Sequence, residues 1–298
     1  MVTIKKESEK EDEDLPASVT YENPVINENC PDPSIIRASD DYFYVYTTQN
    51  NLLGNIRYIP IHKSKDLVHW DYVGTVFDND NHPTWVPNAK LWAPDINYIG
   101  GKYVLYYSMG VWAGTYDSAI GVATADQPEG PFTDHGKVLD YTSQGVNNSI
   151  DQFYIEDNGH KYLVWGSFYG IYAVELTDDG LAVKDGSRKV QLAGNQMEGS
   201  YIAQHGGYFY LIGSAGTCCE GKSSTYHLIF GRSENVLGPY VTQDGESMLN
   251  GAGDLLLQGN NIWRWNQDIM LNFVQDDEGN DWMIYHAYQS LMTLLVDC

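Results

Sequence analysis

Short runs of alternating hydrophobic and polar residues, separated by glycine, aspartate and asparagine turns, fill the chain from residue 21 onward. Alternation over about four to eight residues predicts half-buried strands, and no stretch keeps the 3.6-residue period of a long helix. The first twenty residues are polar and aperiodic. The pattern therefore predicts an all-β chain that follows a disordered N-terminal tail over residues 1–20.

One kind of strand, rich in tyrosine, recurs along the sequence. Each copy follows a turn signal such as Gly100-Gly101, as expected for the second strand of a hairpin. Repeated units of this size, each a small antiparallel sheet, are typical of β-propellers. We therefore predict a five-bladed β-propeller that forms a single domain over residues 21–298. The five copies are residues 42–46, 103–107, 162–165, 208–212 and 282–285.

Acidic residues stand shortly before four of these aromatic strands, where the innermost strand of each blade is expected to begin. They are Asp32, Asp95, Asp151 and Glu198. Inner strands surround the propeller axis, so acids at equivalent positions converge at one end of it. A single such residue more often caps a turn. Several in register suit glycoside hydrolysis, in which one carboxyl group protonates the leaving oxygen and another activates water or attacks the sugar.

Charge and composition narrow the possible partners. The chain carries 17 basic and 40 acidic residues, a formal net charge of −23. A nucleic-acid or anionic-membrane surface needs a basic face, so both partners are excluded. No apolar run reaches the roughly 18 residues of a membrane span, and no apolar leader follows Met1. Four cysteines do not match zinc-ligand spacing, and pairing of Cys218 with Cys219 stays open.

Ordered segments from about Asn23 to Tyr288 resemble family 43 glycoside hydrolases, specifically their arabinanase branch. The stretch of residues 214–219 favours arabinanases over the xylosidase relatives. The segments that carry the resemblance are Pro31–Ile35, Ser64–Trp70, Leu91–Ile96, Ser118–Thr124 with Gly130–Asp134, Tyr162–Phe168 and Ser224–His227.

The resemblance implies a five-bladed propeller that hydrolyses α-1,5-linked L-arabinofuranosyl bonds of arabinan or arabino-oligosaccharides with inversion, in endo or exo fashion. By motif position, Asp32 would be the general base, Glu198 the general acid, and Asp151 the carboxylate that orients the acid and raises its pKa. Inversion requires the carboxyl groups of Asp32 and Glu198 to stand roughly 6.5–9.5 Å apart. The residues expected around the bound sugar are Trp92, Asn148 and Ser167.

The sequence departs from the family pattern at three places. Gln152 follows Asp151 where a proline is usual. The fifth blade lacks the usual histidine, although Asp268 and His286 could hold a calcium or sodium ion in the central channel. For His286 a hydrogen-bonded core position is the favoured reading, and the chemistry itself requires no cofactor. Residues 290–298 do not resemble a closing strand, so the fifth blade is expected to be incomplete after about residue 289, with an exposed edge that favours oligomerisation.

Other readings of the same pattern are kept open. Loops at the channel mouth, and not the acids, decide between endo action and an exo-acting α-L-arabinofuranosidase or β-xylosidase on the same fold. A sugar-binding propeller without catalysis is the alternative from another class. Because arabinan is a plant cell-wall polymer, we expect an extracellular or periplasmic protein, although the chain carries no leader.

Overall fold

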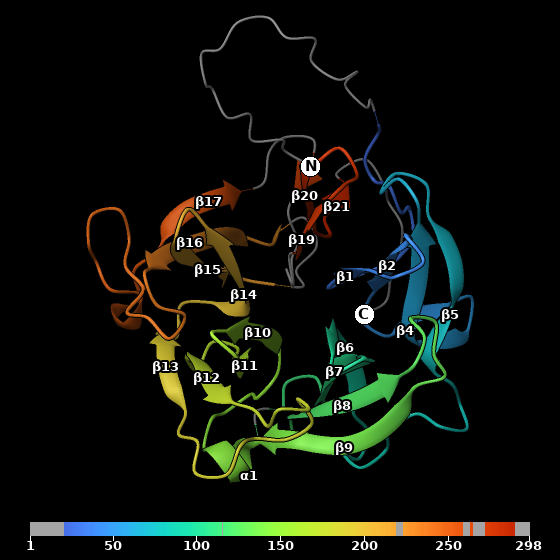
Figure 1. Cartoon of the computed structure of the whole chain (residues 1–298), viewed down its shortest axis with the longest axis horizontal. Helices are drawn as coiled ribbons and strands as arrows, with labels where there is room; N and C mark the ends of the chain where they lie inside the picture. Colours follow the sequence, from blue (N-terminus) through green and yellow to red (C-terminus); the bar gives the residue numbers. More distant parts are fainter. Residues whose placement is uncertain (1–20, 115, 219–222, 259–262, 265–271, 290–298) are drawn as a thin grey trace, which may run out of the picture.

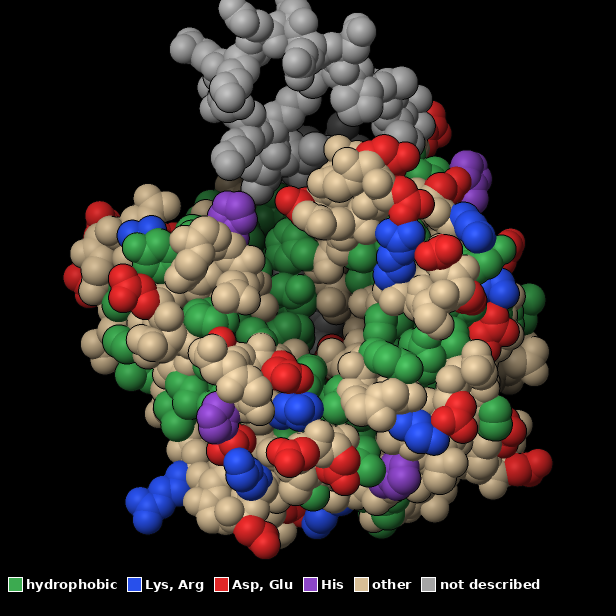
Figure 2. Space-filling view, viewed as in Figure 1, with side chains coloured by type: hydrophobic (Ala, Val, Ile, Leu, Met, Phe, Trp, Pro, Cys, Tyr) green, Lys and Arg blue, Asp and Glu red, His purple; other side chains and the backbone are tan. Residues whose placement is uncertain are grey.

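A computed structural model describes residues 21–114, 116–218, 223–258, 263–264 and 272–289. Antiparallel sheets dominate these residues, accompanied by a short helix, α1 (Tyr141–Gln144), and a 3-10 turn, η2 (Met248–Asn250). Figure 1 shows the sheets arranged around a common axis, and Figure 2 shows the surface hollowed near that axis. The predicted all-β propeller fold is therefore confirmed. Over the described ranges, no helix has the length and apolarity to cross a membrane.

The first two blades follow one another along the chain. Blade 1 consists of β1 (Ser34–Arg37), β2 (Phe43–Tyr46), β4 (Asn55–Ser64) and β5 (Asp71–Phe77), and β3 (Asn50–Leu52) pairs with the first half of β4. Blade 2 consists of β6 (Lys90–Ile99), β7 (Lys102–Gly110), β8 (Ala119–Ala125) and β9 (Thr133–Asp140). In both blades the first strand lies nearest the axis (Figure 1).

Blades 3 and 4 repeat this order. Blade 3 consists of β10 (Phe153–Asp157), β11 (His160–Trp165), β12 (Ile171–Glu175) and β13 (Val190–Ala193). Blade 4 consists of β14 (Glu198–His205), β15 (Tyr208–Ala215), β16 (His227–Ser233) and β17 (Asp254–Gln258). The tyrosine-rich segments form the second strands β2, β7, β11 and β15, as their repetition predicts.

The prediction of five blades is wrong for the described residues, which form four. The fifth sector contains two short pairs instead: β19 (Asn272–Gln275) with β20 (Asp281–Ile284), and β18 (Trp263–Arg264) with β21 (Tyr288–Gln289). The aromatic segment 282–285 contributes β20. The two-residue β21 pairs with β18 and not with β20, so no four-stranded ladder forms within the described ranges.

Hydrophobic clusters fill the spaces between successive sectors. One lies between blades 1 and 2, a second between blades 2 and 3, and a third between blades 3 and 4. A fourth joins Trp282 and Ile284 of β20 to Ile35 and Phe43 of blade 1. On its other side the pair β19–β20 meets blade 4, where the Phe273 ring lies 5.7 Å from the ring of Tyr201. The pair therefore occupies the space between blades 4 and 1, although it is not a full blade.

Candidate active site

The three predicted catalytic carboxylates lie where inner strands begin. Asp32 precedes β1 by two residues, Asp151 precedes β10 by two residues, and Glu198 is the first residue of β14. Neighbouring inner strands are in contact around the axis, so these positions share one end of the propeller (Figure 1). All three are buried, with exposed fractions of 4% for Asp32, 9% for Asp151 and 6% for Glu198.

The backbone at these positions departs from regular strand geometry. Asp32 and Asp151 have φ angles of 52° and 59°, in the left-handed region that residues with a Cβ rarely adopt. In β14 the pairing register shifts between Glu198 and Tyr201, and Gly199 has a φ of 58° at this irregularity. Bulges of this kind re-aim a side chain, and strained backbone is concentrated at functional sites. The backbone at all three acids is therefore set off from the regular strand geometry that follows them.

Asp32 is held by a residue close in sequence and by one from the far end of the chain. The Thr48 hydroxyl donates a hydrogen bond to Oδ2 of Asp32. The backbone N–H of Asp32 donates to Nδ1 of His286, 254 residues away in sequence, at 3.1 Å. Burial lowers the pKa of His286 to about 4, so the ring is neutral at pH 7 and Nδ1 can accept this bond.

Gln152, which stands where the family resemblance predicts a proline, connects Asp151 to blade 2. Ser108 Oγ accepts the Asp151 N–H at 3.0 Å and donates to Oε1 of Gln152 at 2.8 Å. Nε2 of Gln152 donates to the Ala93 carbonyl at 2.5 Å, and the Ala93 N–H donates to Thr48 Oγ1 at 2.7 Å. Because Thr48 also binds the first aspartate, hydrogen bonds connect the two aspartates continuously through blade 2.

Glu198 is held by a chain of polar side chains from blades 2 and 3. Ser167 Oγ donates to Oε2 of Glu198 at 2.5 Å, and Nδ2 of Asn148 donates to Ser167 Oγ at 2.9 Å. Ser118 Oγ donates to Oδ1 of Asn148 at 3.4 Å. The structure thus brings two of the predicted sugar-contacting residues, Asn148 and Ser167, together with the predicted acid. Their contact with a sugar stays a prediction.

The third predicted sugar contact, Trp92, belongs to an aromatic pair. Its ring meets the ring of Trp112 edge-on, with centroids 6.4 Å apart, and Trp112 is 66% exposed. The Trp92 ring lies directly over Gly110, where an added Cβ would come within 2.1 Å of Cζ3. A glycine is therefore needed at the end of β7 for Trp92 to take this position. Exposed aromatic faces of this kind suit the apolar face of a sugar ring.

Asp95 lies inside β6 and connects the inner strands. Its Oδ2 accepts hydrogen bonds from the Tyr154 N–H at 2.7 Å and from Nδ2 of Asn97 at 2.9 Å. Ser34 also hydrogen-bonds to this carboxyl group. Burial raises the pKa of Asp95 to about 7 despite these donors. Because Ser34 is in blade 1 and Tyr154 in blade 3, Asp95 serves as a connection between blades.

The predicted channel cation is not tested by the described residues. Asp268 lies outside them, and among the residues described no group of three or more His, Cys, Asp or Glu side chains could hold a metal ion. His286 Nδ1 accepts the Asp32 N–H, which leaves Nε2 as the ring atom able to bind a cation. A cation at this site stays a prediction.

Sequence analysis missed two hydroxyl residues of the site, Thr48 and Ser108. A repeated signal could have revealed them, because in each of the four blades a hydroxyl residue stands five or six positions after the first tyrosine of the aromatic segment. These residues lie within two positions of the end of the second strand, beside the start of the inner one. The four are Thr48, Ser108, Ser167 and Ser214.

Comparison with known proteins agrees with this geometry. The profile of glycosyl hydrolases family 43 matches residues 21–295. An extracellular endo-α-(1→5)-L-arabinanase of Bacillus subtilis is 33% identical over 276 residues, covering 89% of this chain and 81% of the relative. An extracellular exo-α-(1→5)-L-arabinofuranosidase of Cellvibrio japonicus is 33% identical over 87% of this chain and 79% of its own length.

Solved structures show the same likeness. The α-L-arabinanase of Cellvibrio cellulosa superimposes with a TM-score of 0.78 at 32% identity, covering 87% of each chain. The same enzyme has been solved in complex with arabinohexaose. The profile match covers most of the chain, and the three acids of the site are buried at the starts of inner strands. On this sequence and structural evidence, the chain is a glycoside hydrolase that belongs to glycosyl hydrolases family 43.

Proposed function

We propose that the protein hydrolyses α-1,5-linked L-arabinofuranosyl bonds of arabinan or arabino-oligosaccharides with inversion of the anomeric centre. The observation that carries this proposal is the set of three buried carboxylates, each at the start of a different inner strand and each at a residue that hydrogen-bonds to the neighbouring sector of the ring. The substrate class is supported by the relatives, which are named as enzymes acting on α-1,5-linked arabinan. The chain matches most of the length of these relatives.

In the proposed mechanism Glu198 protonates the leaving oxygen while Asp32 removes a proton from the attacking water. Thr48 donates to the carboxylate of Asp32, and such a bond favours the charged form that a base needs. Asp151 supplies a negative charge that favours the protonated form of Glu198. Attack of water on the face opposite the leaving group needs roughly 6.5–9.5 Å between the carboxyl groups of Asp32 and Glu198.

Endo and exo action both remain within the proposal, because the relatives include enzymes named for each. The acids are common to both modes, and the depth and openness of the surrounding loops decide which bond of a chain reaches them. We therefore propose that an exo-acting enzyme on this fold would use the same acids and would differ from an endo-acting one in its loops.

The experiment that tests the proposal is a time course on linear, unbranched arabinan, with products separated by size and the anomer of the new reducing end followed by NMR. Early oligosaccharides with inverted anomers support endo action, and early arabinose alone supports exo action. Retained anomers would contradict the assignment of Asp32 as base. A complete lack of product from arabinan and from arabinohexaose would contradict the substrate class.

Two further proposals concern the whole molecule. We propose that β19–β20 and β18–β21 are parts of an incomplete fifth blade in a single propeller domain, which is supported by the packing of β20 against blade 1 and of Phe273 against blade 4.

We also propose that the protein acts outside the cytoplasm, because two of its relatives are named as extracellular enzymes. Detection of the native protein only in cytosolic fractions would contradict the second proposal.

A further inference from the structure

A pocket of about 310 Å³ lies where blade 3 meets blade 4. The residues that line it come from both blades: Tyr162 of β11, residues 173–175 of β12, residues 186–188, Val190 of β13, and Leu237, which follows β16. The volume is at the lower end of the range of pockets that bind small ligands. The pocket is therefore of a size for a single ring-shaped molecule.

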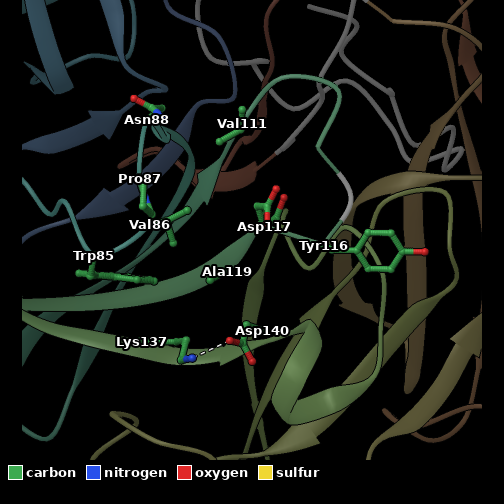
Figure 3. A pocket seen from close by; sticks show the side chains of 11 residues that line it. Trp85, Val86, Pro87, Asn88, Val111, Tyr116, Asp117, Ala119, Lys137 and Asp140 are labelled. Carbon is green, nitrogen blue, oxygen red and sulfur yellow. Dashed lines mark hydrogen bonds and ion pairs between the residues drawn. The ribbon is translucent and has the colours of Figure 1, made fainter.

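The pocket lies at the end of the propeller opposite the acids. Asp151 and Glu198 stand where the inner strands β10 and β14 begin. Strands β12 and β16 run in the same direction as these inner strands, because one antiparallel strand separates each pair. The pocket takes the last residues of β12 and the turn after β16, so it is far from the acids. The larger pocket of blade 2, of about 520 Å³ (Figure 3), instead adjoins the candidate active site, because Ser118 in its lining donates to Asn148.

The charges of the lining leave one cation uncommitted. Arg188 is exposed and makes no hydrogen bond or ion pair with the described residues. The other charged residue of the lining is Glu175, whose Oε1 accepts from Lys184 Nζ at 2.6 Å and lies 2.8 Å from His160 Nδ1. Lys184 and His160 hold the pKa of Glu175 below its usual range. The pocket therefore presents a compensated carboxylate and a free guanidinium, which favours a ligand with one negative charge.

Apolar side chains and two hydroxyl groups make up most of the remaining lining. Tyr162 and Leu237 pack in the hydrophobic cluster between blades 3 and 4, and Val190 is 37% exposed. The Tyr162 hydroxyl makes no hydrogen bond with the described residues. Ser187 Oγ accepts the Glu175 N–H at 3.0 Å, which holds the turn that carries the guanidinium against β12. Such a surface suits a ring with an apolar face.

A carboxylate fits this lining better than other polar groups. A guanidinium binds a carboxylate through two parallel N–H···O bonds, and Arg188 has no competing partner among the described residues. A doubly charged phosphate is less suited, because the described lining contains no second uncommitted cation. The formal charge of −23 repels anions at a distance, but salt screens that repulsion beyond about 8 Å, whereas a bound carboxylate touches the guanidinium.

We propose that this pocket binds a small ring compound that carries one carboxylate. Arg188 pairs with the carboxylate, the Tyr162 hydroxyl forms a hydrogen bond with the ligand, and Val190 and Leu237 contact the apolar face of the ring. Two kinds of molecule share this chemistry, a sugar acid and an aromatic acid. Because the pocket and the acids lie at opposite ends of the propeller, the proposal goes beyond the proposed hydrolysis of arabinan and does not depend on it.

The test measures binding to the whole chain by NMR titration. The probes are D-glucuronate and benzoate, and their uncharged counterparts are D-glucose and benzyl alcohol. At least one of the two acids is expected to bind with a Kd of about 1 mM, and its uncharged counterpart at least about tenfold more weakly. Arg188→Gln removes the charge and is expected to weaken binding of the acid about tenfold. Tyr162→Phe keeps the ring and should weaken it about threefold.

Arg232→Gln is the matched control. Arg232 is an exposed arginine near the end of β16, its guanidinium lies 4.6 Å from the centre of the Tyr208 ring, and it does not line the pocket. The substitution changes the net charge by the same amount as Arg188→Gln, and it is expected to leave binding of the acids unchanged. An equal loss in both variants would show that overall charge and not the pocket attracts the acids, which would overturn the proposal.

The remaining outcomes identify the ligand or reject the site. Binding of glucuronate alone supports a sugar acid and binding of benzoate alone supports an aromatic acid, in each case with the loss in Arg188→Gln. Lack of binding by both acids, or binding that is unchanged in Arg188→Gln, would overturn the proposal. Displacement of the bound acid by arabinohexaose would place it at the candidate active site and would also overturn it. Hydrolysis of arabinan, measured in parallel, should be the same in Arg188→Gln as in the wild type, and its absence in both would contradict the proposed function alone.

Discussion

The two ends of the candidate active site are held by different parts of the ring. Glu198, the proposed acid, is held by Ser167 and through it by Asn148, both from the loops that precede and follow the first hairpin of blade 3. Asp32, the proposed base, receives a hydroxyl donor from Thr48 and places its own N–H on His286, which follows β20 in the fifth sector. The acid therefore depends on complete blades, whereas the base depends on the sector with the shortest strands.

Closure of the ring therefore bears directly on the proposed base and not on the proposed acid. The contact between Asp32 and His286 joins residues 254 positions apart, so it forms only when the last part of the chain docks against blade 1. Docking is supported by the packing of Trp282 and Ile284 against Ile35. Perturbation of the fifth sector should therefore affect the base first.

The largest expected effects come from the two carboxylates themselves. Glu198→Gln and Asp32→Asn should each reduce kcat on arabinan by about 10²- to 10⁴-fold, the range of general acid–base catalysis. An aryl arabinoside with a good leaving group needs no proton from the acid, so it should restore activity to Glu198→Gln and not to Asp32→Asn. Steady-state kinetics on both substrates provides the measurement.

Glu234→Gln is the control for these variants, because Glu234 is an exposed glutamate of blade 4 and should behave like the wild type. Equal restoration of both catalytic variants by the aryl substrate would show that the roles of Asp32 and Glu198 are assigned wrongly.

Changes in the supporting residues come next in size. Ser167→Ala removes a hydrogen bond to the carboxylate of Glu198. His286→Ala removes the acceptor of the buried N–H of Asp32. Each substitution should lower kcat about tenfold. Because a donated hydroxyl favours the charged carboxylate, Ser167→Ala should move the alkaline limb of the pH–rate profile to higher pH. His286→Ala should leave that limb in place and lower Tm. A shift of the alkaline limb in His286→Ala would contradict the separation of the two ends.

A smaller effect is expected at the connection between the two aspartates. Gln152→Ala removes the bonds to Ser108 and to the Ala93 carbonyl, so the backbone of Asp151 loses part of its support. We expect kcat on arabinohexaose to fall about threefold to fivefold with little change in KM, because positioning is lost and substrate contacts are not. Gln204→Ala, at an exposed position of β14, is the matched control. A rise in KM alone would instead assign Gln152 to sugar binding.

Asp95→Asn should have the smallest effect on catalysis. Its main effect should be on the pH dependence of the free energy of unfolding. The pKa of Asp95 is raised from 3.8 to about 7, so between these values the folded protein binds more protons than the unfolded chain. Stability should therefore fall as the pH rises from about 4 to about 7, with a slope for this group of about 1 kcal/mol per pH unit.

Asp95→Asn keeps a side chain of the same shape and removes the titration. The measurement is urea unfolding of the wild type and of Asp95→Asn at several pH values, with the two curves subtracted. His286 has its pKa lowered to about 4, which contributes a slope of opposite sign in both proteins and cancels in the difference. A difference that does not change with pH would show that Asp95 does not titrate in this range.

Much of the fold follows from local pattern. The tyrosine-rich segments, which the sequence predicts as second strands of hairpins, form β2, β7, β11 and β15, because side-chain alternation and turn residues act over a few neighbouring positions. The fifth copy also forms a strand, β20. The number of complete blades did not follow from this repeat, because a blade also needs outer strands, and the two-residue β21 pairs with β18 instead of extending the β19–β20 pair.

The candidate site likewise combines features that follow from the local sequence with contacts that depend on the fold. The placement of acids at the starts of inner strands follows from the sequence, since Asp32, Asp151 and Glu198 keep a regular spacing from the repeated aromatic segments. The side chains that hold these acids are set by the three-dimensional fold. Thr48 and His286 meet at Asp32 although they are far apart in sequence, and hydrogen bonds act over about 3 Å of space whatever the separation along the chain. Such partners are chosen by the closure of the ring, which no local pattern contains.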